Sequence, residues 1–301
     1  MAIVDRLSDC IGNTPTLRLS HLAPAGVELF AKAEFLNPGG SIKDRPIREI
    51  LDAAHARGEL QPDSVLVEAT SGNTGISLAM LCAERGYACV LVMPEDMSLE
   101  RRRILRAYGA RVELTARELG MAGAVARAQA LAHGLSDGQA VMTRQFENLD
   151  NPNAHEKTTA LEILRDLDGK LDVLIGGVGT GGSLMGTARG LRRTLPNLKV
   201  IAVEPHKAQA LAGLPFKPHS IQGIGAGFVP KVVKREEIDR IVPVHDDDAT
   251  QMAARLAQAH GLLVGPSSGA NLWAALQEAH SAPAGTRILT FLCDSGERYL
   301  A

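Results

Sequence analysis

Short apolar runs alternate with amphipathic segments along most of the chain. Runs that are apolar at successive positions are typical of strands buried on both faces of a parallel sheet. They occur at residues 65–67, 89–93, 112–114, 173–175, 200–203 and 288–292. The amphipathic segments predict helices at residues 76–85, 99–108, 121–133 and 183–195. This alternation of strands and helices predicts a three-layer α/β architecture with right-handed crossovers.

Glycines and aspartates mark the ends of several predicted helices. Gly86, Gly109 and Gly261 follow helical segments, where a residue in the left-handed conformation commonly ends the helix. Three aspartates at residues 246–248 precede a helical segment that runs to about residue 260, and they suit the positive end of its dipole. These signals support the helix limits that the apolar pattern indicates.

Two turn-rich polar stretches, at residues 34–40 and 148–153, divide the pattern. The second stretch follows a strand-like segment at residues 141–143. We therefore expect a smaller α/β domain at residues 36–146 and a larger one formed by residues 1–35 and 147–301. Ligands of α/β proteins bind beyond the carboxyl ends of the strands, so a cleft between these domains is the expected binding site.

Charge and hydropathy argue against two classes of partner. The formal net charge of -2 gives no electrostatic reason to bind nucleic acid or an anionic membrane. The basic cluster at residues 101–103 lies in a helical pattern, and we interpret it as a solvated helix face. No apolar run is long enough to span a bilayer, and the N-terminus lacks a signal pattern. A soluble cytoplasmic protein is therefore expected.

The cysteines and histidines predict neither a metal site nor a disulfide framework. Cys10, Cys82, Cys89 and Cys293 show no paired spacing, and the 9 histidines are scattered. His155 follows a turn-rich stretch, and we interpret it as a residue at the start of a helix rather than a metal ligand or a base. The expectation is a protein of a reducing compartment with no bound metal.

The main candidate for chemistry is Lys43, which lies in the turn-forming stretch NPGGSIKDRP at residues 37–46. A lysine amine held in a shielded pocket loses part of its hydration, so its pKa falls and it becomes a nucleophile. Such an amine can form a Schiff base with an aldehyde cofactor. Most lysines at helix starts are solvated surface groups, so the interpretation of Lys43 depends on motifs elsewhere in the chain.

The stretch GVGTGGS at residues 177–183 follows a predicted strand and opens a predicted helix. Glycines let the backbone come close to a phosphate, and free N–H groups at a helix start favour a dianion. A tight turn with no ligand has the same residues. Gly177, Gly179 and Gly182 also match the G-x-G-x-x-G dinucleotide pattern, with Glu204 ending the next strand, so an NAD-dependent dehydrogenase is an alternative. A dinucleotide gives no task to Lys43, whereas a phosphate-bearing aldehyde uses both motifs.

Two further loops lead into predicted helices. In TSGNTG at residues 70–75, hydroxyls, an amide and backbone N–H groups are typical of a carboxylate site, although a well-capped helix has the same residues. In GPSSGA at residues 265–270, Ser267 or Ser268 is either a helix N-cap or a ligand-binding residue.

These stretches, together and in this order, resemble the cysteine synthase (O-acetylserine sulfhydrylase) family of pyridoxal-phosphate enzymes. The resemblance runs from IGNTP at residues 11–15 to SGERYL at residues 295–300, nearly the whole chain. It implies a tryptophan-synthase-β-like fold of two three-layer α/β domains, with the cofactor in the cleft between them, and a homodimer. Residues 37–45, 68–70, 93–98 and 293–294 resemble the B form of the family, and residues 155–159 and 221–228 resemble the A form.

The resemblance assigns roles to the candidate residues. Lys43 is expected to carry the Schiff base with pyridoxal 5'-phosphate and to act as the general base. Asn73 and Ser267 are expected to bond to the ring hydroxyl and the pyridine nitrogen of the cofactor. The phosphate cup is expected at Gly179, Thr180, Gly181, Gly182 and Ser183. The site for the substrate α-carboxylate is expected at Thr70, Ser71, Gly72, Thr74 and Gln145.

The implied reaction is a β-replacement, in which acetate leaves O-acetylserine and sulfide adds to give L-cysteine. A cystathionine β-synthase or an O-phosphoserine-using relative shares these motifs, but a phosphoester should require an extra cation, for which Lys217 and Arg103 are candidates. A more remote alternative is a non-catalytic regulatory subunit, because members of the family also bind the C-terminal tail of serine acetyltransferase. The presence of Lys43 favours catalysis.

Overall fold

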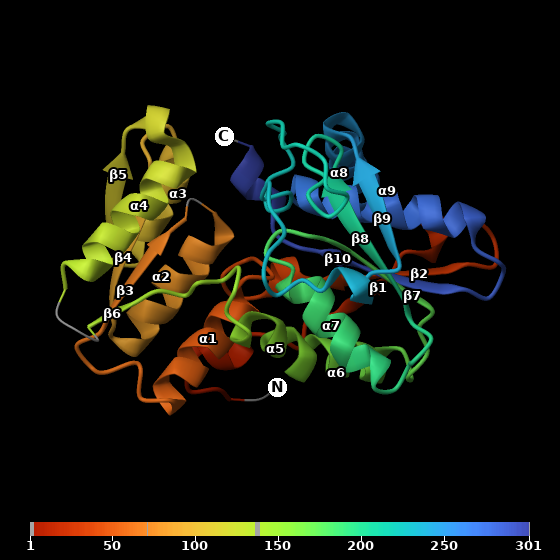
Figure 1. The fold of residues 1–301 in the computed structure, drawn as a ribbon. Helices are drawn as coiled ribbons and strands as arrows, with labels where there is room; N and C mark the ends of the chain where they lie inside the picture. Colours follow the sequence, from red (N-terminus) through yellow and green to blue (C-terminus); the bar gives the residue numbers. More distant parts are fainter. Residues whose placement is uncertain (1–2, 71, 136–138, 301) are drawn as a thin grey trace.

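The computed structural model describes residues 3–70, 72–135 and 139–300. In this part of the chain the strands form two separate sheets, and helices pack on both faces of each (Figure 1). This is a mixed α/β fold of two three-layer units, as the alternating pattern predicts.

The larger sheet has six strands in the order β1-β2-β10-β7-β8-β9. Its neighbours are parallel except for β1, which pairs with β2 in the antiparallel direction. The strands are β1 (Thr16–Arg18), β2 (Glu28–Ala33), β7 (Val173–Gly177), β8 (Lys199–Pro205), β9 (Arg240–Val244) and β10 (Arg287–Leu292).

Successive side chains of each central strand enter different cores of this larger unit. Val173 and Ile175 pack with α8 and α9, whereas Leu174 between them packs with α6 and α7 on the other face. The strands therefore read as continuous apolar runs, because both of their faces are covered. The helices of this unit are α5 (Asp150–Lys157), α6 (Thr159–Asp166), α7 (Gly182–Arg192), α8 (Asp246–His260) and α9 (Pro266–Ser281).

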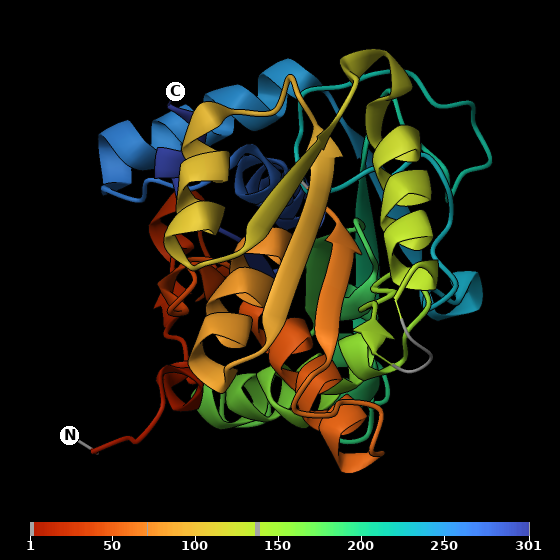
Figure 2. The same ribbon diagram turned by 90° about the vertical axis from the view of Figure 1, so that its left-hand side faces the viewer.

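The smaller sheet has four parallel strands in the order β5-β4-β3-β6. Leu66 packs in a core with α1, α2 and α3, and Val67 packs with α4 on the opposite face. Figure 2 shows α4 on one side of these strands and α2 and α3 on the other. The strands are β3 (Val65–Ala69), β4 (Ala88–Pro94), β5 (Arg111–Thr115) and β6 (Ala140–Val141). The helices are α1 (Asp44–Ala56), α2 (Asn73–Arg85), α3 (Leu99–Ala107) and α4 (Gly120–His133).

Short 3-10 turns complete the described chain, and the last of them lies between the two sheet units (Figure 1). They are η1 (Leu7–Cys10), η2 (Ser20–Leu22), η3 (Glu34–Leu36), η4 (Arg117–Leu119), η5 (Arg235–Glu237) and η6 (Gly296–Tyr299). Residues 296–299 are therefore placed between the two units.

Most of the predicted elements are confirmed. Each of the six predicted strands lies within β3, β4, β5, β7, β8 or β10, and Gly86, Gly109 and Gly261 all have positive φ angles. Two predictions were wrong in extent, because only residues 140–141 pair in β6 and α7 ends at Arg192. The turn expected at residues 148–153 is largely the first turn of α5, where Pro152 is tolerated because the N–H groups of a first turn have no intrahelical acceptor.

The strands β1, β2 and β9 were not predicted, because polar residues and a proline interrupt their apolar patterns. Lys32 in β2 is fully buried among partners that are distant in sequence, and Pro243 is tolerated in β9 because that strand forms the edge of the sheet. We propose residues 36–146 as the smaller domain, since all four strands of its sheet fall between residues 65 and 141.

Candidate active site

A cavity of about 320 Å³ lies between the two units, beyond the carboxyl ends of β3 and β7. Among its lining residues are four that the sequence assigned to cofactor binding: Lys43, Asn73, Gly179 and Thr180. Four that were assigned to the substrate carboxylate also line it: Thr70, Gly72, Thr74 and Gln145. Ser71, predicted beside them, lies outside the described residues. The structure thus brings together three motifs that are far apart in the sequence.

Lys43 lies at the N-cap of α1, at the end of a tightly held glycine turn. The amide of Gly39 donates to Asp44 Oδ2 at 2.5 Å, and a Cβ at residue 39 would lie 2.3 Å from the other oxygen of that carboxylate. The amide of Ile42 donates to the carbonyl of Cys293 at 2.8 Å. Burial lowers the pKa of the Lys43 amine, and the neighbouring Cys293 and Asp294 partly oppose that effect.

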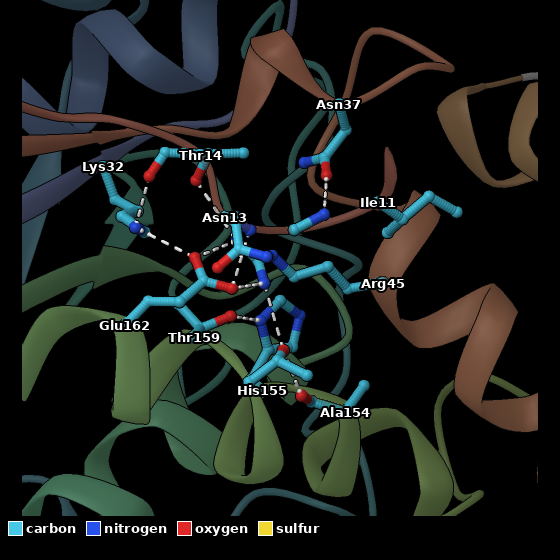
Figure 3. Close-up of polar contacts among 12 residues, drawn as sticks. Ile11, Asn13, Thr14, Lys32, Asn37, Arg45, Ala154, His155, Thr159 and Glu162 are labelled. Atoms are coloured by element: carbon cyan, nitrogen blue, oxygen red, sulfur yellow. Dashed lines mark hydrogen bonds and ion pairs between the residues drawn. The ribbon is translucent and has the colours of Figure 1, made fainter. Parts of the chain in front are cut away.

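A buried charge cluster fixes the start of α1 to the larger unit. Arg45 donates to both oxygens of Glu162, at 2.6 and 2.8 Å, and both of these side chains are shown in Figure 3. On its other side Arg45 donates to both oxygens of Glu34, at 2.7 and 2.8 Å. Lys32 lies 2.9 Å from Glu162 and donates to the carbonyl of Thr14 at 2.5 Å (Figure 3). Because Arg45 follows Lys43 by two residues, this cluster sets the position of the lysine.

The charges in this cluster stabilise one another. Burial opposes ionisation of Glu162, but the hydrogen bonds and the charge of Arg45 outweigh it and hold the pKa of Glu162 at about 2. In the same way, Arg45 outweighs burial and lowers the pKa of Glu34. An isolated charge at this depth would be strongly unfavourable, so each ion depends on the others.

His155 belongs to the same cluster and is kept neutral. It is buried within α5, not at the start of that helix as predicted, and its Nδ1 lies 2.9 Å from Thr159 Oγ1 (Figure 3). Burial and the positive charge of Arg45 lower its pKa to about 3. His155 is therefore a neutral ring packed inside this cluster.

The glycine-rich loop between β7 and α7 packs so closely against neighbouring segments that side chains would not fit at its glycines. Gly181 has a φ of 83° and forms the N-cap of α7. A Cβ at Gly179 would lie 2.1 Å from the carbonyl oxygen of Gly223, and one at Gly182 would lie 1.9 Å from Asn151 Oδ1. Gly179 and Thr180 line the cavity, and the 11-residue helix α7 begins just after them, at Gly182. This arrangement fits a phosphate dianion.

Glu204 is not placed to bind the ribose of a dinucleotide. Its Oε1 accepts a hydrogen bond from the amide of Leu211 at 2.9 Å, and the side chain is buried. Glu204 therefore orders the loop that follows β8, whereas in a dinucleotide site the acidic residue binds a ribose.

The carboxylate loop leads from β3 into α2, with Gly72 at the N-cap. Thr74 Oγ1 donates to Gln145 Oε1 at 2.8 Å, which joins the loop to the segment after β6. The amide of Gly72 lies 3.3 Å from Thr70 Oγ1. Hydroxyls and a helix N-terminus face one side of the cavity, as a carboxylate ligand requires.

Asn73 is oriented by the C-terminal segment. Its Nδ2 donates to Asp294 Oδ2 at 2.6 Å, its Oδ1 accepts from Arg298, and Tyr299 donates to the same Asp294 oxygen at 2.5 Å. Burial raises the pKa of Asp294, while the bonds from Tyr299 and Asn73 oppose that effect. The sequence indicated residues 293–300 only as part of a family pattern and did not predict these contacts.

The two serines at the start of α9 have different environments. Ser268 Oγ accepts from the amide of Cys293 at 2.8 Å and so holds the end of β10. Ser267 is buried, and its Oγ lies 3.7 Å from the position that a Cβ on the pocket residue Gly223 would take. Gly265 is the N-cap of α9, so neither serine occupies the capping position. Ser268 thus holds the backbone at the end of β10, whereas Ser267 lies beside Gly223, a residue that lines the cavity, and its side chain bonds to the thiol of Cys293.

Several pocket residues were not predicted. Arg101 was interpreted as part of a solvated face, yet its exposed fraction is 9% and it lines the cavity. Arg103 and Lys217, the cations proposed near a leaving group, are exposed. Nine lining residues had no role assigned from the sequence: Ala69, Arg101, Met121, Phe146, Gln222, Gly223, Ile224, Ala226 and Tyr299.

Residues 3–70, 72–135 and 139–300 lack a metal-binding cluster and a membrane-spanning helix. No cluster of three or more histidine, cysteine, aspartate or glutamate residues is arranged there to hold a metal ion. Nor does any helix in those ranges combine the length and the apolar character needed to cross a membrane.

A family model, known sequences and solved structures all relate this chain to pyridoxal-phosphate-dependent enzymes. A model of the family described as "Pyridoxal-phosphate dependent enzyme" matches residues 7–294. The chain is 47% identical to cysteine synthase B of Campylobacter jejuni, over 100% of this chain and 98% of that protein. Among solved structures, a cysteine synthase (OASS) from Entamoeba histolytica is 38% identical with a TM-score of 0.96, covering 100% of this chain and 90% of that one. An O-acetylserine-dependent cystathionine β-synthase from Helicobacter pylori is 37% identical with a TM-score of 0.94, covering 100% and 98%.

Proposed function

The chain belongs to the family of pyridoxal-phosphate-dependent enzymes, and from this premise we propose that it is a cysteine synthase. It replaces the acetyl ester of O-acetylserine with sulfide and releases L-cysteine and acetate. The observation that carries the proposal is that Lys43, Gly179 and Thr180 line one cavity together with Thr70, Gly72 and Thr74. The similarity to cysteine synthases over the whole chain supports it.

The residues present fit pyridoxal 5'-phosphate. The glycine loop and the N-terminus of α7 would hold the phosphate, Lys43 would hold the aldehyde carbon, and Asn73 and Ser267 would bond to the ring. When bound, the cofactor supplies an electron sink for the α-carbon of the substrate. Gly179, Gly181 and Gly182 cannot accept a side chain without displacing neighbours, so the shape of this cradle is built into the packing.

The protein's own groups then account for substrate binding and proton transfer. The N-terminus of α2, with Thr70, Thr74 and Gln145, binds the α-carboxylate of the amino acid. The amine of Lys43 has a lowered pKa, so a larger share of it is unprotonated and able to take the α-proton as general base. Met121 and Phe146 add apolar surface to the same cavity and reduce the access of water.

The contacts of Arg101 favour an acyl ester over a phosphoester. The guanidinium of Arg101 already donates to Gln222 Oε1 at 2.8 Å and lies over the ring of Tyr299. Arg103 and Lys217, the other cations considered, are exposed. A phosphate leaving group would require a cation directed at it, so O-acetylserine is the better match.

Three finer expectations follow from the family resemblance. We propose that the enzyme is a homodimer, that it acts in the cytoplasm, and that its pocket accepts the C-terminal tail of serine acetyltransferase. Light scattering of the purified protein tests the first of these, and competition between a tail peptide and O-acetylserine tests the last.

The function is tested by spectroscopy and by kinetics. The purified protein should show the visible absorption of a lysine-linked cofactor, and the Lys43→Ala variant should lose it. The value of kcat/KM for O-acetylserine with sulfide should exceed that for serine with homocysteine, because acetate is a far better leaving group than hydroxide. A higher value for serine with homocysteine would assign the chain to the cystathionine β-synthases. O-acetylserine with homocysteine is the third pair to compare, given the resemblance to the Helicobacter pylori protein.

A further inference from the structure

One wall of the cavity is formed by a contact between the two units. Arg101, in α3 of the smaller unit, donates from Nη2 to Gln222 Oε1 at 2.8 Å, and its Cζ lies 5.5 Å from the ring centroid of Tyr299. Gln222 lies between Ile221 and Ile224, which are buried in the core of the larger unit. Tyr299 ends η6, a turn whose first amide donates to the carbonyl of Leu263. Gln222 and Tyr299, which Arg101 contacts, therefore belong to the larger unit.

The position of α3 is coupled to the carboxylate loop by packing. Leu105 lies one turn after Arg101 on the same face of α3 and is buried. Its Cδ2 lies 3.7 Å from the position that a Cβ on Gly75 would take, and Gly75 is in the first turn of α2. A displacement of Arg101 therefore moves the helix that supports residues 72–75.

A second contact closes the same wall. Asp294 Oδ2 accepts both from Asn73 Nδ2, at 2.6 Å, and from the hydroxyl of Tyr299, at 2.5 Å. The ring on which Arg101 lies is thus fixed by the carboxylate that also holds the first residue of α2. Arg101 and Asn73 come from the smaller unit, and Tyr299 and Asp294 come from the C-terminal segment of the larger one.

We propose that Arg101 is a positioning residue that clasps the smaller unit to the larger one and holds residues 72–75, at the start of α2, over the bound amino acid. A planar guanidinium suits this task because it can donate to an amide and stack on an aromatic ring at once. Holding residues 72–75 in place excludes water from the cavity and slows the release of the ligand. The nature of that ligand, a serine-derived amino acid, depends on the function proposed above.

Four variants of the holoenzyme test the proposal: Arg101→Ala, Gln222→Ala, the double variant, and Arg103→Ala as the matched control. Arg103 has the same charge on the same helix but is exposed. We expect Arg101→Ala to raise the KM for O-acetylserine by about tenfold with kcat unchanged or higher, because a hydrogen bond to a charged group is lost while the reacting groups remain. Arg103→Ala should keep the KM of the unaltered enzyme.

The double variant shows whether Arg101 and Gln222 act through their shared contact or affect KM independently of each other. Gln222 is exposed, so Gln222→Ala should fold normally and raise KM by a smaller factor than Arg101→Ala. The double variant should be no worse than Arg101→Ala, because the two changes remove one shared contact. Effects that multiply, an unchanged KM in Arg101→Ala, or a fall in kcat at constant KM would overturn the proposal. A fall in kcat at constant KM is the result expected if Arg101 acted in the chemical step or only stabilised the fold.

Backbone hydrogen exchange tests the role of Arg101 without catalysis, so its result does not depend on the proposed function. Backbone hydrogen exchange at residues 72–76 and 99–105 should be faster in Arg101→Ala and Gln222→Ala than in Arg103→Ala. If the unaltered protein does not convert O-acetylserine and sulfide, the proposed function fails, but the exchange rates still test the clasp. Equal exchange in all variants would overturn the clasp even if the enzyme is a cysteine synthase.

Discussion

Arg45 and Glu34 form a fully buried bidentate ion pair, with nitrogen–oxygen distances of 2.7 and 2.8 Å. Glu162 completes the enclosure of the guanidinium on the other side. We expect Arg45→Met to lower the free energy of unfolding by about 3–5 kcal/mol, because it leaves the buried carboxylate of Glu34 without its cation and leaves Glu162 with Lys32 as its cation. Urea unfolding measures this loss.

The matched comparison for Arg45 is Arg117, whose pair with Glu118 is exposed, with 70% and 67% of the two side chains accessible. Arg117→Met should change the free energy of unfolding by no more than about 1 kcal/mol. Equal losses in the two variants would show that the buried pair contributes no more than an exposed one.

His155 should make the stability of the protein depend on pH. Its pKa is about 3 in the folded protein, below its ordinary value of 6.5, so between these values the unfolded chain binds more protons. The stabilisation is complete above pH 6.5 and is lost as the pH falls toward 3, at about 1.4 kcal/mol per pH unit. His155→Gln should show a shallower fall between pH 6 and 4 when unfolding is followed by denaturant titration.

The difference in pH-dependent stability between the unaltered protein and His155→Gln reports the contribution of His155 alone. Asp44, whose pKa burial raises to about 6, contributes with the opposite sign between pH 3.8 and 6, but it does so in both proteins. Parallel profiles for the unaltered protein and His155→Gln would mean that His155 is protonated in the fold.

Thr74→Val should weaken the binding of amino acids while leaving the cofactor in place. The change removes the hydroxyl that donates to Gln145 Oε1 and faces the carboxylate site. Loss of a hydrogen bond to a charged group costs roughly 1.5–3 kcal/mol, so the Kd for L-cysteine should rise at least tenfold. Titration followed by the visible spectrum measures both ligands. Loss of the cofactor with unchanged affinity for cysteine would show that the loop binds a different ligand.

Ser267→Asp should change the course of the reaction. A serine hydroxyl carries no charge, whereas a carboxylate beside the ring nitrogen would raise its pKa and keep it protonated. A protonated ring is a stronger electron sink, so products of racemisation and transamination should appear beside cysteine. Chromatography of the amino-acid products measures their ratio.

Ser268→Ala is the control, because Ser268 holds the amide of Cys293 instead of facing the pocket. This variant should keep the product ratio of the unaltered enzyme. If Ser268→Ala alters the ratio and Ser267→Asp does not, the roles of the two serines are reversed.

The sequence by itself determined most of the strands, the helices that join them and the loops that carry the chemistry. Apolar periodicity depends on local geometry, so residues 65–67 and 200–203 could be recognised as strands without knowledge of their neighbours. Gly179 and Gly182 were recognisable because a glycine-rich turn between a strand and a helix is typical of a phosphate site. Lys43 could be singled out because the glycine turn before it and two other motifs pointed to one cofactor.

Only the tertiary structure decided the environments of the charged residues. Arg101 and Arg103 are the same residue type on one helix, but two positions rotate a side chain by about 200°, so one faces the cavity and the other is exposed. Lys32 and Arg45 are buried because Glu162, more than a hundred residues away, reaches both of them. Whether a charge is solvated or enclosed depends on contacts between distant segments, and a pattern of neighbouring residues carries no record of those contacts.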